Sequence, residues 1–264
     1  MIERYINNRV NAIWNDQNRF DTWKLIQEKY VETLEQLKIA EAGIAKKIRE
    51  AEVSKEEVYK QEEVTNHDLA SFVDILQKKV GEGSNWIHYG LTSSDIVDSA
   101  NSLLILQSIE IAQELILDLL KELKLKAKEN KDTKIIGRTH GVYAEETFLG
   151  NIFGNWYLEI KRSLDRVERA KVSIAYGKLS GPVGNHTVVT EEMEKITLEK
   201  LGLKPEIFAS QIVSRDRYAE VFTSLSILAS TYERISTNLR SYQRSEISEM
   251  YEPCLLYTSD AADD

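Results

Sequence analysis

Cysteine and proline are both scarce in this chain of 264 residues. The single cysteine, Cys254, excludes a disulfide framework and cysteine-based zinc sites. The three prolines all lie after residue 181, and neither glycine nor proline occurs between Gly90 and Gly137 or between Pro205 and Pro253. Strand-rich folds need turn residues every 8–12 positions or so, and these gaps therefore favour long helices.

The chain also has no long apolar run and no excess of positive charge. No apolar stretch approaches the roughly 18 residues of a membrane span, and the first 20 residues carry charges where a secretory signal would be apolar. The formal net charge of −9 argues against a general nucleic-acid binder. We therefore expect a cytoplasmic protein with no membrane span and no nucleic-acid partner.

Periodic apolar residues predict an all-α fold. From Ile96 to Glu129 they cover more than half of a helix circumference, which is typical of a helix at the centre of a bundle. Further long helices are predicted at about Ala144–Ala175 and about Asp216–Glu249. Before residue 90 the pattern indicates shorter helical segments, at Thr22–Ala51 and about Lys55–Lys79. Helices buried on several sides usually find some of their partners on other subunits, so we expect an oligomer.

This pattern divides the chain into three parts. Residues 1–95 are expected to form a small N-terminal helical domain, and residues 96–253 are expected to form a long-helix bundle. Residues 254–264 are a tail of different character, which contains the only cysteine.

Histidines, glycines and hydroxyl groups gather in four short clusters, at residues 65–68, 86–95, 137–141 and 178–187. The second cluster ends with Thr92 to Asp95, directly before the longest predicted helix. Several N-cap candidates and unpaired backbone N–H groups at a helix start bind anions well. The same residues also fit a plain N-cap without a ligand.

The histidines have both chemical and structural interpretations. His140 follows Arg138 by two residues, and an imidazole beside a guanidinium suits general acid chemistry on an anionic substrate. A helix-start histidine bonded to a backbone carbonyl would give the same pattern. His67 and Asp68 are neighbours, and neighbours in a helix do not face each other, so no direct pairing is expected. His186 is expected to be merely exposed. No metal-ligand spacing is present, so no metal site is predicted.

The second and third clusters carry a resemblance to a known family. His88–Asp95 (HYGLTSSD) and Gly137–Gly141 (GRTHG) resemble two motifs of the adenylosuccinate lyases, a branch of the fumarase/aspartase superfamily of fumarate-releasing lyases. Residues 1–5, 65–68 and 210–217 are similar to further parts of the same enzymes. The resemblance covers residues 1–253 in the right order. It implies the long-helix bundle of that superfamily and a homotetramer whose sites are each built from three subunits.

The resemblance also implies a reaction and a set of residues. Adenylosuccinate would lose fumarate to give AMP, and the succinylated aminoimidazole carboxamide ribotide (SAICAR) would lose fumarate to give AICAR, in purine nucleotide biosynthesis. These anionic nucleotides need hydroxyl groups, helix N-termini and arginines around them. No cofactor is implied. The general acid would be His140, and the substrate-binding residues would be Arg4, Tyr5, Asn66, His67, Asp68, Thr92, Ser93 and Gln211, with His88, Arg138 and Thr139 as further candidates.

The sequence departs from the family pattern in three places. Asn66 stands where many relatives have arginine, and Tyr143 stands where many have histidine. After Pro253 the family continues into a loop, Gly-Ser-Ser-x-Met-Pro-x-Lys-x-Asn, that supplies a serine base, whereas residues 254–264 show no resemblance. Our hypothesis is that this tail comes from a cloning or assembly boundary and that the gene continues. The resemblance then implies that the bundle of residues 96–253 is incomplete, that the C-terminal domain is absent, and that this chain alone is inactive.

Two other interpretations remain open at this point. The chain could belong to a superfamily lyase that acts on another succinyl adduct, which would release no AMP from adenylosuccinate. It could also be a non-catalytic helical oligomerisation module. A retired site has no reason to keep His67, Ser93, His140 and Gln211 together, and their joint presence favours an enzyme.

Overall fold

The computed structural model describes Arg4 and residues 6–251. The expectations for Tyr5, Pro253 and the tail 254–264 lie outside the described residues. The chain forms two compact units. The first comprises the residues up to Ala112 together with Arg169–Val221, and the second comprises Gln113–Glu168 together with the described residues from position 222 onward. The division into domains that the sequence predicts, at residues 95 and 253, stays a prediction.

The first unit is a cluster of short helices with one small parallel strand pair. Its helices and strands are α1 (Asn8–Trp14), α2 (Asp16–Gln36), α3 (Ile44–Glu50), α4 (Lys55–Thr65), α5 (Asp68–Val80), the 3₁₀ turn η2 (Ser84–Trp86), β3 (Tyr176–Gly177), α8 (Glu191–Lys200) and β4 (Lys204–Pro205). Helix α2 packs against α3, α4 and α8. Phe20, Trp23 and Phe72 form its aromatic centre, with ring centroids 5.2–6.0 Å apart. Ile96 and Ala100, near the start of the long helix that begins at Ser93, belong to the same buried apolar core.

Three long helices follow, which confirms the all-α prediction: α6 (Ser93–Glu129), α7 (Leu149–Ile174) and α9 (Asp216–Tyr242). Each of these three helices begins in one unit and ends in the other. Helix α6 has 37 residues, or about 55 Å at 1.5 Å per residue. Within the described residues, no helix is both long and apolar enough to cross a membrane.

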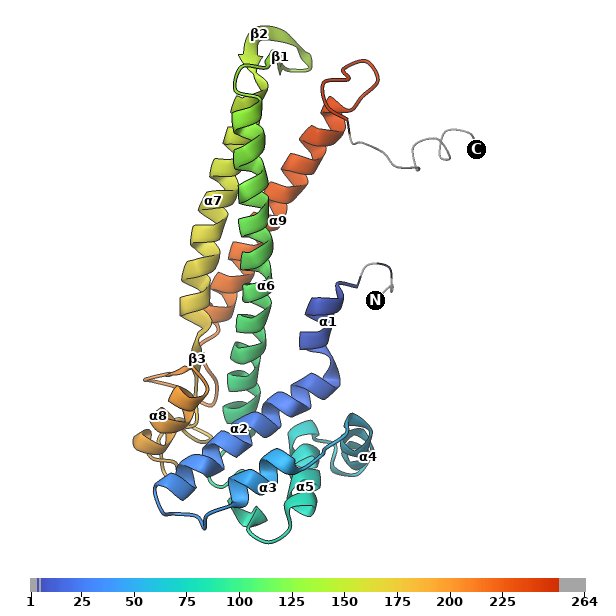
Figure 1. The fold of residues 1–264 in the computed structure, drawn as a ribbon. Helices are drawn as coiled ribbons and strands as arrows, with labels where there is room; N and C mark the ends of the chain where they lie inside the picture. The colour runs from blue at the N-terminus through green and yellow to red at the C-terminus, as the bar shows by residue number, and fades with distance from the viewer. Residues whose placement is uncertain (1–3, 5, 252–264) are drawn as a thin grey trace. The chain divides into compact units, whose positions relative to one another are not determined.

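The second unit carries a β-hairpin that the sequence interpretation missed. Strands β1 (Lys134–Thr139) and β2 (Val142–Phe148) pair antiparallel at the end of α6 (Figure 1). Thr139 pairs with Val142, so His140 and Gly141 form a two-residue turn, and both have positive φ, of 58° and 78°. Two-residue hairpin turns of type I′ need positive φ at both central positions. Helix α7 consequently begins at Leu149, later than the predicted Ala144.

Three other predicted helical segments differ from the structure. The segment predicted at about Lys55–Lys79 divides into α4 and α5, because Asn66 adopts a left-handed φ of 54° between them. The segment predicted as Thr22–Ala51 divides into α2 and α3, because Lys38 and Gly43 adopt left-handed φ values of 60° and 100° between them. The last long helix ends at Tyr242, before the predicted Glu249, and the chain then turns back on itself: the Glu249 N–H donates to the Tyr242 carbonyl over 3.1 Å.

Candidate active site

The start of α6 is built around a buried carboxylate. Asp95, in the first turn, accepts the Thr92 N–H at 2.8 Å, and the Asp95 N–H donates to the Thr92 carbonyl at 3.0 Å. This reciprocal arrangement satisfies donors that a helix start leaves unpaired. The Asp95 side chain is fully buried. Asp95 therefore supplies the helix-interior half of a capping box, and its side chain is directed inward.

The loop that follows β3 is bonded to the same carboxylate. The Lys178 ammonium forms an ion pair with Asp95 and donates to the Gly181 carbonyl at 3.0 Å, while the Gly181 N–H donates to Asp95 at 3.2 Å. Burial raises the pKa of the Asp95 carboxyl, and the Lys178 ammonium opposes that shift. The ion pair thus holds the loop after β3 against the start of α6.

His67 lies beside this helix start. It is the N-cap of α5, and its Nε2 lies 3.2 Å from the Ser93 hydroxyl. Its Nδ1 lies 3.4 Å from the Ala70 N–H and 3.3 Å from an Asp68 carboxylate oxygen. Nδ1 accepts the Ala70 proton when unprotonated and donates to Asp68 when protonated, so these two contacts suit opposite protonation states.

The expectation that His67 and Asp68 do not pair directly is wrong. It assumed that both residues lie inside a helix. His67 instead has extended backbone, with φ of −150°, because Asn66 before it ends α4 in the left-handed region at φ 54°. The side chains of His67 and Asp68 are 48% and 43% exposed, so both are accessible to a ligand.

His88 is held from inside the unit. Its backbone N–H donates to the Gln27 amide oxygen at 2.9 Å, and the Gln27 amide nitrogen lies 2.9 Å from His88 Nδ1. Because the backbone N–H fixes the amide orientation, Nδ1 must accept and the ring must be neutral. Burial accordingly lowers the pKa of His88 to about 4.

Close backbone approaches position the segment that contains Gln211. A Cβ at Gly184 would lie 2.0 Å from the Ala209 carbonyl oxygen, and Gly184 has φ of 72°. A Cβ at Gly90 would likewise lie 2.4 Å from the Val188 side chain. The loop 178–190 therefore contacts both the second cluster and the residues just before Gln211. Gln211 and Arg4 are exposed.

His186 is not simply exposed, contrary to the sequence expectation. Its Nδ1 lies 3.0 Å from the Val189 carbonyl and its Nε2 lies 3.7 Å from Glu194, whose other carboxylate oxygen accepts the Leu179 N–H at 2.7 Å. Burial raises the pKa of Glu194. His186 and Glu194 border a cleft of about 450 Å³ that Phe208 also lines.

The remaining predicted residues belong to the second unit. Arg138 and Thr139 end β1, and His140 is exposed at the hairpin turn. The Arg138 guanidinium donates to both carboxylate oxygens of Glu249, at 2.8 and 2.9 Å. The candidate general acid and the candidate binding residues of the first unit thus come from separate compact units.

Direct contacts between predicted residues join His67 to Asp68 and to Ser93. Lys178, Gln27 and Glu194 were missed, because their roles depend on partners distant in sequence. Lys178 begins one of the four clusters, which was the available signal. Within the described part of the chain, no group of three or more His, Cys, Asp or Glu residues is placed to hold a metal. Hydroxyl groups, an imidazole and a helix start can bind a carboxylate or a phosphate.

Comparisons with known proteins identify the class of protein to which this helical fold belongs. The profile of a protein family described as lyase matches residues 9–259. The chain belongs to this lyase family.

Individual relatives show which lyases the chain resembles in sequence and in fold. The chain is 40% identical over 254 residues to an adenylosuccinate lyase of Thermotoga maritima and 40% identical over 257 residues to one of Aquifex aeolicus. These alignments cover 96% of this chain and 59% of each relative. Its fold is similar to that of a beta-carboxy-cis,cis-muconate cycloisomerase from Acinetobacter calcoaceticus, with a TM-score of 0.87, 20% identity, and coverage of 97% of this chain and 62% of that one.

Proposed function

We propose that this chain is part of an adenylosuccinate lyase, which eliminates fumarate from adenylosuccinate to give AMP and from SAICAR to give AICAR. The 40% identity to two enzymes of that name supports the substrate. The observation that carries the proposal is the contact of His67 with Ser93 at the start of α6, at 3.2 Å. It brings together two motifs whose residues suit an anionic ligand.

The residues divide the work of the reaction as follows. A base removes a proton from the carbon beta to the departing nitrogen, the electron pair forms the carbon–carbon double bond of fumarate, and the carbon–nitrogen bond breaks. His140 then protonates the departing nitrogen. The Thr92 and Ser93 hydroxyl groups, together with the positive end of the α6 dipole, bind a substrate carboxylate. Asn66, Asp68, Gln211, Arg4 and Tyr5 complete the binding residues, and His67 orients Ser93.

The complete protein works as a homotetramer that shares its sites between subunits, in the cytoplasm. The separation of the candidate residues between two compact units supports shared sites. In the second unit, large apolar side chains are exposed on all three long helices, and such surfaces mark protein contacts. They are Leu115, Leu117, Leu125, Leu158, Phe222 and Ile227.

The first experiment sequences the source DNA across codon 253 and beyond. We expect it to continue into the Gly-Ser-Ser-x-Met-Pro-x-Lys-x-Asn loop. The complete gene product is then incubated with adenylosuccinate, and AMP and fumarate are measured by chromatography. Equal amounts of both products support the proposal. Fumarate release from argininosuccinate instead would assign a different superfamily lyase, and a genuine stop after codon 264 with no turnover would favour a non-catalytic module.

A further inference from the structure

Arg138 is fully engaged within the protein. Its guanidinium and the Glu249 carboxylate form a two-pronged pair, although 111 residues separate them. The side chains are 21% and 18% exposed. One guanidinium nitrogen also lies 3.4 Å from the Ile136 carbonyl. Glu249 raises the pKa of Arg138. A planar guanidinium matches a carboxylate in this fork geometry, which is specific as well as strong.

The hairpin is shaped to present Arg138 to this partner. Ile136 pairs with Glu146 and Arg138 pairs with Tyr143, so β2 has one extra residue opposite Gly137. Such a bulge redirects the neighbouring side chains. Gly137 is required there because a Cβ would lie 2.8 Å from the Glu145 carbonyl oxygen.

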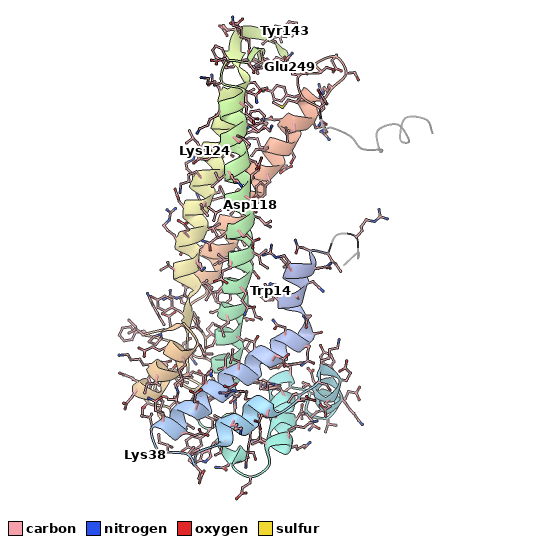
Figure 2. All side chains as sticks on the ribbon, in the orientation of Figure 1. Trp14, Lys38, Asp118, Lys124, Tyr143 and Glu249 are labelled. Atoms are coloured by element: carbon pink, nitrogen blue, oxygen red, sulfur yellow. The ribbon has the colours of Figure 1, made fainter. Side chains whose placement is uncertain are left out.

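Tyr143 covers the other side of the arginine. Its ring centroid lies 5.4 Å from the Arg138 guanidinium carbon, a cation–π distance. Tyr143 and Glu249 both lie at the hairpin end of the second unit (Figure 2). The residue that stands where many relatives have histidine therefore contacts the arginine of the same hairpin.

Both ends of the ion pair are anchored to long helices. The hairpin continues directly into α7, where the Leu149 N–H donates to the Thr133 carbonyl at 2.9 Å. On the other side, the Glu249 N–H is bonded to Tyr242, the last residue of α9. Because both segments are already held in place, the two side chains lose little freedom when the pair forms. The pair therefore fixes the hairpin relative to the residues after α9.

We propose that Arg138 and Glu249 form a clamp that fixes the His140 turn relative to the segment after α9. Arg138 is thus a positioning residue, and it does not bind the substrate anion. A substrate carboxylate would have to displace Glu249 from both guanidinium nitrogens of Arg138. The consequence for catalysis rests on the proposed function: the segment that contains Glu249 leads toward the position of the expected base loop, so one ion pair holds the acid and the approach to the base in register.

The clamp itself is tested on the 264-residue chain by amide hydrogen exchange of residues 134–148. Glu249→Gln removes the charged acceptor and should speed exchange in the hairpin about tenfold or more, since hydrogen bonds to charged groups contribute about 1.5–3 kcal/mol. The swapped double variant R138E/E249R should return exchange toward the original rate, whereas either single reversal should not.

A matched control breaks another pair of the same type in the same unit. Glu159 on α7 pairs with Arg234 on α9. Glu159→Gln should leave exchange in residues 134–148 unchanged. Unaltered hairpin exchange in Glu249→Gln, or a swapped double variant that exchanges as fast as the worse single variant, would overturn the clamp.

A second measurement separates positioning from substrate binding in the complete gene product. Glu249→Gln should lower kcat for fumarate release at nearly unchanged KM, and R138E/E249R should recover part of that kcat. If Arg138 bound the substrate anion, the swap would place a carboxylate against it, KM would rise and activity would stay lost, which would overturn the positioning role. Absence of lyase activity in the unaltered product would refute the proposed function and leave the exchange result to decide the clamp.

Discussion

The Lys178 ammonium and the Asp95 carboxylate form an ion pair with no exposed side-chain surface, although 83 residues separate them in the chain. The same carboxylate accepts the N–H groups of Thr92 and Gly181. Removing a charge from water is costly, and the hydrogen bonds of the pair to the backbone of Thr92 and Gly181 offset part of that cost. One side of the candidate site therefore depends on a single buried contact.

Asp95→Asn should lower the free energy of unfolding by about 3–5 kcal/mol, because it leaves the Lys178 ammonium buried without a counter-charge. Urea unfolding measures this loss. The matched control is Asp165→Asn, since Asp165 pairs with Lys161 on an exposed helix face, where the side chains are 44% and 47% exposed. Such a pair is worth about 0.5 kcal/mol or less. A loss at Asp95 as small as that of the control would show that the ion pair does not stabilise the unit.

His88 should make stability depend on pH. Its pKa is about 4 in the folded protein, below the ordinary histidine value of 6.5, because burial disfavours the charged ring. Below pH 6.5 the unfolded chain binds a proton that the folded one does not, so stability falls as the pH falls toward 4. Between pH 7 and pH 5 this contribution is about 2 kcal/mol.

The test of this contribution compares the original chain with His88→Asn at both pH values. Asparagine tolerates the positive φ of 63° at this position and does not titrate. Between pH 7 and pH 5 the free energy of unfolding should fall by about 2 kcal/mol less in the variant than in the original chain, as measured by urea unfolding. Equal losses in the two proteins would mean that Gln27 does not hold the ring neutral.

The sequence predicts the long helices well because their signal is local. Between Gly90 and Gly137 the chain has no helix-breaking residue, and apolar positions recur over more than half of the helix circumference. The hairpin was missed although its signal was also local. Ile135 and Ile136 before the turn, and Val142 and Tyr143 after it, are β-branched or aromatic residues that favour strands. Between these runs, Gly141 supplies a residue that readily adopts the positive φ of a two-residue hairpin turn.

The candidate site could be predicted in part. The clusters named its residue types, and His67 of the first cluster lies 3.2 Å from the Ser93 hydroxyl of the second. Which partners the charged residues would choose was not predictable, because Lys178 and Arg138 pair with residues 83 and 111 positions away. Pairing over such separations is set by the packing of the helices and not by local spacing.

Gly184→Ala should destabilise the first unit and loosen the segment before Gln211. The new Cβ would lie 2.0 Å from the Ala209 carbonyl oxygen at a positive φ, so the backbone must move. We expect a loss of about 2 kcal/mol or more in the free energy of unfolding. Amide exchange at residues 206–212 should also become faster.

Gly154→Ala is the control for this substitution. Gly154 lies in α7 with no neighbouring atom within 4 Å of the added Cβ, and alanine favours a helix by about 1 kcal/mol. This variant should be as stable as the original chain or more so. If Gly184→Ala were equally harmless, the close approach of the two loops would not exist in solution.

His140→Asn separates the chemistry of this residue from its role in the turn. His140 has φ of 58° beside Gly141 in the hairpin turn, a backbone conformation that asparagine adopts readily and alanine does not. The turn should therefore survive, and amide exchange in residues 134–148 should be unchanged. Asparagine cannot supply a proton, so fumarate release by the complete gene product should fall by about 10²–10⁴-fold, the usual effect of losing a general acid. Near-normal turnover in this variant, with the hairpin intact, would assign proton donation to another group.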